Sequence, residues 1–223
     1  MSFLTHIQEV FELHANTENA TAMQAYMKDR FSFYGIKAPD RKRLLKEVHA
    51  EHKEEVDGNI RTLTDHLYQL EARELHYCAM ELYQKCLKKK YLETDVSQIE
   101  KLITTHSWWD TVDFIAKHIL GYYLLLFPNE INSVITSYSK AENMWLNRSA
   151  ILFQLAYKNK TDASLLFDLC IQHKDSNEFF IQKAIGWALR EYSKVNPEEV
   201  VSFVSKTKLK PLSEREALKR IHA

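Results

Sequence analysis

An aromatic residue and a charged residue recur together three times in this chain at nearly constant spacing. The aromatic residues Trp109, Trp145 and Phe180 are 36 and then 35 residues apart. The charged residues that go with them are 35 residues apart in each case: Asp113, Arg148 and Lys183. This spacing is typical of stacked helix-pair repeats, in which equivalent positions of successive units line up in space. The pattern therefore predicts a column of one acid and two bases beside aromatic side chains, which indicates a binding surface with one carboxylate for chemistry.

Helices are favoured along the whole chain. Only four glycines and four prolines interrupt it, and apolar residues recur between them at three- and four-residue steps. Breaks into helical hairpins are predicted at Ala38–Asp40, Asp57–Asn59, Phe127–Asn129, Asp175–Asn177, Asn196–Pro197 and Lys210–Pro211. We therefore predict an all-α fold, an α-α superhelix (solenoid) of HEAT-like helical-hairpin repeats that forms a single domain over residues 1–223.

The composition indicates a soluble protein. At 223 residues, 45% of them hydrophobic, the chain can bury a sizeable core. No apolar run approaches the roughly 18 residues of a membrane span and no signal-peptide pattern is present, so we expect a cytoplasmic protein without membrane contact. The cysteines are odd in number and lack a Cys-x-x-Cys pair, which favours buried thiols over a disulfide framework or a zinc site: Cys78, Cys86 and Cys170.

Basic and acidic residues balance, 30 against 30, but they are unevenly distributed. Residues 24–53 carry eight basic and four acidic residues, and residues 140–223 carry fourteen and ten. Two basic ends around an acidic middle suit a polyanionic ligand held at both flanks. The alternative, which charge alone favours, is that these residues form ordinary solvated helix faces.

Several enzyme classes are excluded because their motifs are absent. The glycines are isolated from one another, so the chain has no Gly-x-Gly-x-x-Gly, no phosphate-binding loop and no Gly-x-Ser-x-Gly. His49 and His52 lack the glutamate and the spacing of a zinc-protease helix, and we expect them to be surface histidines. Nucleotide-cofactor enzymes, serine hydrolases and metal centres are therefore not predicted.

Five segments together carry a family resemblance: Tyr26–Lys28, Gly35–Arg41, Ser107–Asp113, Trp145–Gln154 and Phe179–Tyr192. In this order, over nearly the whole chain, they resemble the bacterial DNA alkylation repair glycosylases of the AlkD type. The Trp-Trp-acid and Gly-Trp-x-x-Arg-Glu segments are the specific parts. The resemblance implies a superhelix of HEAT-like repeats whose concave face holds duplex DNA. It also implies removal of cationic alkylated purines, chiefly N3-alkyladenine and N7-alkylguanine, by cleavage of the N-glycosidic bond.

A single carboxylate is enough for that reaction. Alkylation at N7 or N3 makes the purine cationic, so the base leaves as a neutral molecule without a proton from a general acid. What remains is to stabilise the positive charge that develops on the deoxyribose and to position a water molecule, and a fixed charge acts strongly in a water-poor site. Asp113 is the candidate catalytic carboxylate, whereas ordinary glycosidases need a pair of carboxyl groups.

Two tryptophans complete the candidate catalytic site. Trp109 lies one helical turn before Asp113, where an indole can contact the deoxyribose and attract a cationic base by about 0.5–2 kcal/mol. Trp187 lies one helical turn after Lys183 in the later repeat and can form the opposite wall. Core packing is the usual role of a tryptophan at helical spacing. The family resemblance overrides it for Trp109 and Trp187, but not for the other two tryptophans.

Arg148 is the natural phosphate ligand, because its planar guanidinium group matches two oxygens. The alternative is an Arg148–Asp113 salt bridge that ties two repeats together, and both roles can hold. The weaker candidates for phosphate contact are Arg190, Lys183, Lys158, Lys42 and Arg43. The alternative for each is an ordinary solvated side chain. Tyr26 is a candidate for stacking on DNA or hydrogen bonding to it, and its alternative role is an aromatic cap on the first repeat.

We therefore expect a monofunctional DNA glycosylase of base excision repair. It would act as a monomer on double-stranded DNA containing alkylated purines, with no metal, no nucleotide cofactor and no obligate protein partner. No lysine stands out as a Schiff-base nucleophile, so strand cleavage is not expected. The alternatives are a non-catalytic relative that recognises unusual DNA structures and a helical-repeat scaffold for proteins. The joint presence of Trp109, Asp113, Arg148 and Trp187 argues against the first, and DNA affinity that falls steeply with salt would exclude the second.

Overall fold

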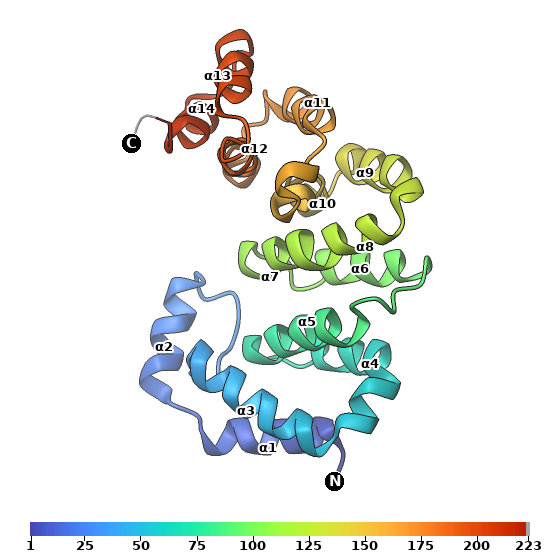
Figure 1. Cartoon of the computed structure of the whole chain (residues 1–223). Helices are drawn as coiled ribbons and strands as arrows, with labels where there is room; N and C mark the ends of the chain where they lie inside the picture. The colour runs from blue at the N-terminus through green and yellow to red at the C-terminus, as the bar shows by residue number, and fades with distance from the viewer. Residues whose placement is uncertain (222–223) are drawn as a thin grey trace. The chain divides into compact units, whose positions relative to one another are not determined.

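The computed structural model describes residues 1–221, and their regular structure is helical (Figure 1). Among these residues no β-strand is present, and Ser32 and Ala72 form one isolated bridge. The all-α fold predicted from the sequence is confirmed. The contacts within the chain divide it into two compact units, of which the first is Met1–Lys90 and the second begins at Tyr91. The single domain predicted over the whole chain stays a prediction.

The first unit contains five α-helices: α1 (Phe3–Leu13), α2 (Thr17–Tyr26), α3 (Ala38–Glu51), α4 (Lys53–Tyr68) and α5 (Arg73–Leu87). In α1, Phe3, Ile7 and Phe11 follow one another at four-residue steps, so they share one face, and all three are fully buried. This face packs on α3 and α4. Burial of each such side chain contributes about 1.5–3 kcal/mol, which anchors the N-terminal helix on the unit.

The segment between α2 and α3 is held by one buried carboxylate. Glu74, on α5, accepts hydrogen bonds from the backbone N–H groups of Tyr34, Gly35 and Ile36, at 3.2, 2.9 and 3.2 Å. Gly35 has a φ of +86°, and a Cβ atom there would lie 2.0 Å from the carbonyl oxygen of Asn16. Only glycine fits this position, and the carboxylate fixes the loop that follows α2.

The break predicted at Asp57–Asn59 is a kink within α4, because Asn59 has non-helical backbone angles, φ −125° and ψ 20°, and the helix resumes after it. Val56 and Ile60 lie on either side of Gly58 and are both buried. Since both halves of the helix are anchored in the same core, a single glycine, which costs about 1 kcal/mol relative to alanine, does not end it. The other predicted breaks fall between helices or at helix starts.

The second unit consists of helical hairpins stacked along the chain. Its elements are α6 (Asp95–Thr104), α7 (Trp109–Phe114), η1 (Ile115–Leu120), α8 (Gly121–Leu126), η2 (Pro128–Glu130), α9 (Ile131–Lys140), α10 (Met144–Leu152), η3 (Phe153–Ala156), η4 (Lys158–Lys160), α11 (Ala163–His173), α12 (Phe179–Tyr192), α13 (Pro197–Lys206) and α14 (Pro211–Leu218). Helix α9 packs on α10, α11 on α12 and α13 on α14, while α7, α10, α12 and α14 contact one another in succession. This stacking puts the three repeated segments on neighbouring helices, as their spacing predicts.

Helix α7 continues directly into the π-helix η1 and then into α8. Gly121, where α8 begins, lies against η3, and a Cβ atom there would be 2.3 Å from the carbonyl oxygen of Phe153. The Tyr157 hydroxyl donates a buried hydrogen bond of 2.6 Å to the Gly121 carbonyl oxygen. Short π-helical segments are frequent at functional sites, and this one immediately follows the helix that carries Trp109 and Asp113. Among the described residues, no helix is both long and apolar enough to cross a membrane.

Candidate functional site

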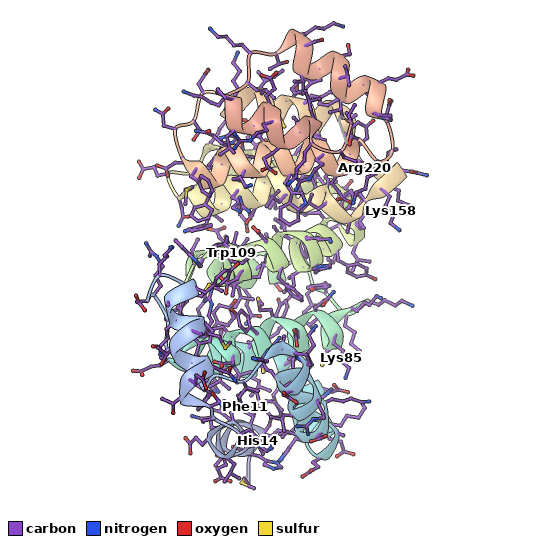
Figure 2. All side chains as sticks on the ribbon, turned by 90° about the vertical axis from the view of Figure 1, so that its left-hand side faces the viewer. Phe11, His14, Lys85, Trp109, Lys158 and Arg220 are labelled. Atoms are coloured by element: carbon purple, nitrogen blue, oxygen red, sulfur yellow. The ribbon has the colours of Figure 1, made fainter. Side chains whose placement is uncertain are left out.

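Two short helices position the central charged pair. Trp108 is extended, with φ −155° and ψ 163°, and its carbonyl oxygen accepts a hydrogen bond of 3.0 Å from the Val112 N–H as α7 begins. Trp109, labelled in Figure 2, is the first residue of α7, and Asp113 follows one turn later on the same helix. Helix α10 starts at an Asn143 cap, whose side chain accepts from the Trp145 N–H at 2.9 Å. A cap of this kind stabilises a helix by about 1 kcal/mol.

Arg148 and Asp113 form a bidentate salt bridge between α10 and α7. Arg148 Nε donates to Asp113 Oδ1 at 2.7 Å, and Arg148 Nη2 donates to Asp113 Oδ2 at 2.8 Å. The remaining terminal nitrogen, Nη1, donates to the carbonyl oxygen of Phe180 on α12. Arg148 is only 4% exposed and the Asp113 side chain 14%. The salt bridge between repeats is therefore present, and it uses the guanidinium edge that a phosphate would need.

Burial and ion pairing act in opposite directions on Asp113. Burial is the largest cause and raises the pKa of its carboxyl group above the ordinary value, while the hydrogen bonds and charge of Arg148 lower the pKa. Arg148 thus opposes the effect of burial on a carboxyl group that lies where water is largely excluded. A fixed negative charge in such surroundings interacts more strongly with a developing positive charge than it would in bulk water.

Three aromatic rings pack together beside this pair. The ring centroids of Trp108 and Trp145 are 5.8 Å apart, and each lies 5.1 Å from that of Phe180. Phe180 also lies 5.8 Å from the Arg148 guanidinium carbon, so the cluster borders the salt bridge. Phe179, the neighbour of Phe180, is an exposed large apolar residue. Core packing, expected for Trp108 and Trp145, agrees with these contacts.

Trp187 and the two basic residues on α12 have a different environment. Trp187 is partly buried and packs against the apolar cluster to which all helices from α10 to α14 contribute. Lys183 Nζ donates to Glu216 Oε1 at 2.8 Å, and Arg190 donates to the other oxygen of the same carboxylate. These hydrogen bonds, that of Lys183 first, hold the pKa of Glu216 below its usual value. The phosphate contacts predicted for Lys183 and Arg190 therefore compete with an acid on α14.

Sequence reasoning missed Glu216, although a signal was present. It lies 33 residues after Lys183, close to the repeat length, and so extends the column by one more unit. In the structure the column pairs internally: Asp113 with Arg148, and Lys183 with Glu216.

The predicted DNA contacts near the N-terminus belong to the first unit. Tyr26 ends α2 and is 68% exposed. Lys42 is exposed on α3, with its Nζ 4.0 Å from the Glu81 carboxylate, and Arg43 is ion-paired with Glu47 at 3.2 Å on the helix surface. These side chains are accessible to a ligand, and their DNA contacts stay predictions.

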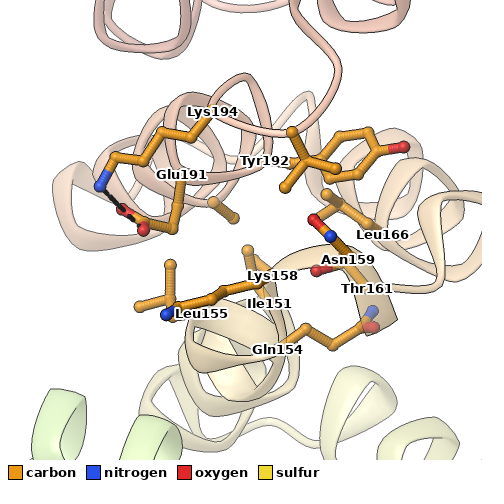
Figure 3. A pocket seen from close by; sticks show the side chains of 12 residues that line it. Ile151, Gln154, Leu155, Lys158, Asn159, Thr161, Leu166, Glu191, Tyr192 and Lys194 are labelled. Atoms are coloured by element: carbon orange, nitrogen blue, oxygen red, sulfur yellow. Dashed lines mark hydrogen bonds and ion pairs between the residues drawn. The ribbon is translucent and has the colours of Figure 1, made fainter.

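A cavity of about 320 Å³ lies in the second unit between η3, η4, α11 and α12 (Figure 3). Ile151, Leu155 and Leu166 contribute apolar surface to it, and Lys194 and Glu191 form an ion pair at its edge. Of the described residues that line it, none belongs to the predicted catalytic set. Lys158, a weaker phosphate candidate, lines this cavity instead, with a φ of +53°.

The chain is a helical-repeat protein with a buried Asp–Arg pair between repeats, and comparison with known proteins places it in a family. The family model described as "DNA alkylation repair enzyme" matches residues 7–221, so the chain belongs to the family of DNA alkylation repair enzymes. It is also similar to a solved structure described as a predicted DNA alkylation repair enzyme from Enterococcus faecalis. The two are 36% identical over 92% of this chain and 95% of that one, with a TM-score of 0.84. No curated protein matches.

Proposed function

We propose that this protein is a monofunctional DNA glycosylase of the AlkD type, which hydrolyses the N-glycosidic bond of cationic alkylated purines in duplex DNA. The observation that carries the proposal is the enclosed carboxylate of Asp113, which lies on the helix that begins with Trp109. Two hydrogen bonds from Arg148, on α10, hold this carboxylate in place. Membership of the DNA alkylation repair family supports the substrate class.

In this mechanism the protein supplies charge and position instead of a proton. The alkylated base carries its own positive charge and leaves as a neutral molecule. As the bond breaks, positive charge develops on the deoxyribose, and Asp113 stabilises it and orients the attacking water. Arg148 is a positioning residue, because it fixes both carboxylate oxygens, and it lowers the pKa of the carboxyl group against the effect of burial. Trp109 and Trp187 are proposed to border the sugar and the cationic base.

The DNA contacts form a second part of the proposal. Side chains of both units are proposed to contact the DNA backbone. They are Tyr26, Lys42 and Arg43 of the first unit and Lys183 and Arg190 of the second. The two basic residues on α12 would do so by exchanging Glu216 for phosphate oxygens. Arg148 is too enclosed to be a main phosphate ligand, so its contribution to DNA affinity is expected to be small.

Release of free base from a duplex with a single N7-methylguanine tests the reaction. Asp113→Asn should lower the rate constant of release by about two to three orders of magnitude, the range for loss of one electrostatic stabiliser. Asp168→Asn is the matched control, since Asp168 is an exposed acid on α11 in the same unit. It should release base at the wild-type rate.

The same assay separates the proposal from its alternative. If wild-type protein binds this duplex but releases base no faster than a protein-free sample, the non-catalytic DNA-recognition role replaces the proposal. If wild type and Asp113→Asn are equally active, Asp113 serves only as the partner of Arg148.

A further inference from the structure

Three helices of the first unit bring a histidine, an aspartate and a cysteine together. His49 lies in the last turn of α3, Asp57 in the first half of α4, and Cys86 near the end of α5. One possible ligand atom from each lies within 4.8 Å of the others. The side chain of His49 is 7% exposed, so the prediction that it is a surface residue is wrong. The side chain of His52, predicted in the same way, is 15% exposed.

The distances approach those of a tetrahedral metal site. His49 Nε2 is 3.6 Å from Asp57 Oδ1, and Cys86 Sγ is 3.4 Å from the same oxygen. Zinc bonds of about 2.0–2.3 Å to nitrogen, oxygen and sulfur place tetrahedral ligands about 3.3–3.6 Å apart. Two of the three pairs are therefore already at the separation that zinc requires.

His49 supplies an independent indication that something belongs between these groups. Its Nε2 atom is buried and has no hydrogen-bond partner among the described residues. The Asp57 oxygen it faces is too distant at 3.6 Å for a hydrogen bond. Buried polar atoms are rarely left unpaired, since each costs about 1–3 kcal/mol. A metal ion bound to Nε2 would satisfy this atom and join α3, α4 and α5.

We propose that His49, Asp57 and Cys86 form a three-ligand site for a divalent transition metal ion, with zinc the ion that best matches an imidazole, a carboxylate and a thiolate. The three residues border a cavity of about 390 Å³, from which water can supply a fourth ligand. The site belongs to the first unit and Asp113 to the second, and the proposal does not depend on the proposed glycosylase activity. It would stabilise the first unit.

Lysines around the cavity oppose the ion and set the conditions for binding. Lys85 Nζ lies 3.1 Å from His49 Nδ1, and Lys53 hydrogen-bonds to Asp57 Oδ2. Asp57 Oδ1 accepts a hydrogen bond from the Cys86 thiol, and the ion would take the place of the proton in that bond. Beside a charged Lys85, Nδ1 is an acceptor, so the imidazole proton is on Nε2. Binding of the metal ion therefore requires the Lys85 side chain (labelled in Figure 2) to move away and the imidazole proton of His49 to shift to Nδ1. The Cys86 thiol releases one proton to water in the same step.

Cobalt(II) provides a direct probe, since a cobalt–thiolate bond gives a near-ultraviolet charge-transfer band. Wild-type protein titrated with Co²⁺ should develop this band at one equivalent, and added Zn²⁺ should abolish it. Cys86→Ala should lose the band, whereas Cys170→Ala, which removes a buried thiol in the second unit, should keep it. Absence of the band in folded wild-type protein, or its persistence in Cys86→Ala, overturns the proposal.

Lys85 offers a second test that a merely structural cluster would not pass. Lys85→Gln removes the opposing charge and supplies an amide oxygen to accept from Nδ1–H, as partners of metal-bound histidines do. Zn²⁺ affinity, measured by competition with a chelator, should rise about 10- to 100-fold. Lys88→Gln removes another charge from the same cavity and leaves His49 unchanged, so its gain should be much smaller. Equal affinities in Lys85→Gln and wild type would refute the assignment.

Discussion

Replacement of Arg148 by methionine should destabilise the second unit far more than loss of a surface arginine would. Methionine preserves much of the apolar stem but leaves the Asp113 carboxylate and the Phe180 carbonyl oxygen without their donor. Both Arg148 and Asp113 are enclosed, at 5% and 14% side-chain exposure. Removal of one partner from a buried ion pair costs about 3–5 kcal/mol, because the other charge stays buried and unpaired.

The cost should depend on pH. Burial raises the pKa of Asp113 and Arg148 lowers it, so the variant loses the opposing effect and its folded-state pKa rises further above that of the unfolded chain. The folded variant then binds a proton more readily than the unfolded chain. Its stability falls as pH rises through the interval between the two pKa values. The difference from wild type should therefore be largest near neutral pH and smaller in acid.

Urea unfolding followed by tryptophan fluorescence measures this effect, since all four tryptophans lie in the second unit. The matched control is Lys194→Met, which removes one partner of the partly exposed Glu191–Lys194 pair and should cost about 0–1 kcal/mol. The double variant Asp113→Asn/Arg148→Met should be more stable than Arg148→Met alone, because no charge is left buried.

Two outcomes would refute this reasoning. A cost below about 1 kcal/mol for Arg148→Met at neutral pH would place the pair among weak surface ion pairs. Additive costs in the double variant would show that the two side chains are not energetically coupled.

Three further perturbations test other parts of the structure. Gly121→Ala should lower the melting temperature and the free energy of unfolding, the latter by about 1–3 kcal/mol, because its Cβ would lie 2.3 Å from the Phe153 carbonyl oxygen. The control is Gly58→Ala, whose Cβ would have no atom within 4 Å, and it should be neutral or stabilising. Glu216→Gln should strengthen DNA binding and steepen its salt dependence by about 0.9 per freed phosphate contact, and an unchanged slope in fluorescence anisotropy would remove the α12 bases from the proposed interface. Burial lowers the pKa of His173 below its ordinary value of 6.5, because the neutral imidazole is favoured in the folded state. The stability that the neutral imidazole contributes is lost as pH falls through and below that value. Thermal unfolding of His173→Gln between pH 7 and 5 should therefore be less sensitive to acid than that of wild type.

The local sequence pattern was sufficient to predict the helices. It did not predict which interruptions end a helix, because that depends on the burial of the residues around them. The repeat spacing correctly put Trp109 and Asp113 on one helix and their counterparts on the helices stacked beside it. The break predicted near Gly58 is a kink at Asn59 and not the end of a helix, because two buried residues beside it hold both halves of α4 in one core. A propensity of about 1 kcal/mol cannot outweigh burial of several apolar side chains.

The amino-acid sequence by itself determined which residues are helical and which of them recur at equivalent places, because both depend on periodicity along the chain. Only the tertiary structure decided the partners. It enclosed Arg148 with Asp113, brought Glu216 to the bases on α12, and assembled His49, Asp57 and Cys86 from three helices. The physical reason is that desolvation and the geometry of ion pairs depend on every element packed around a side chain, and no single segment contains that information.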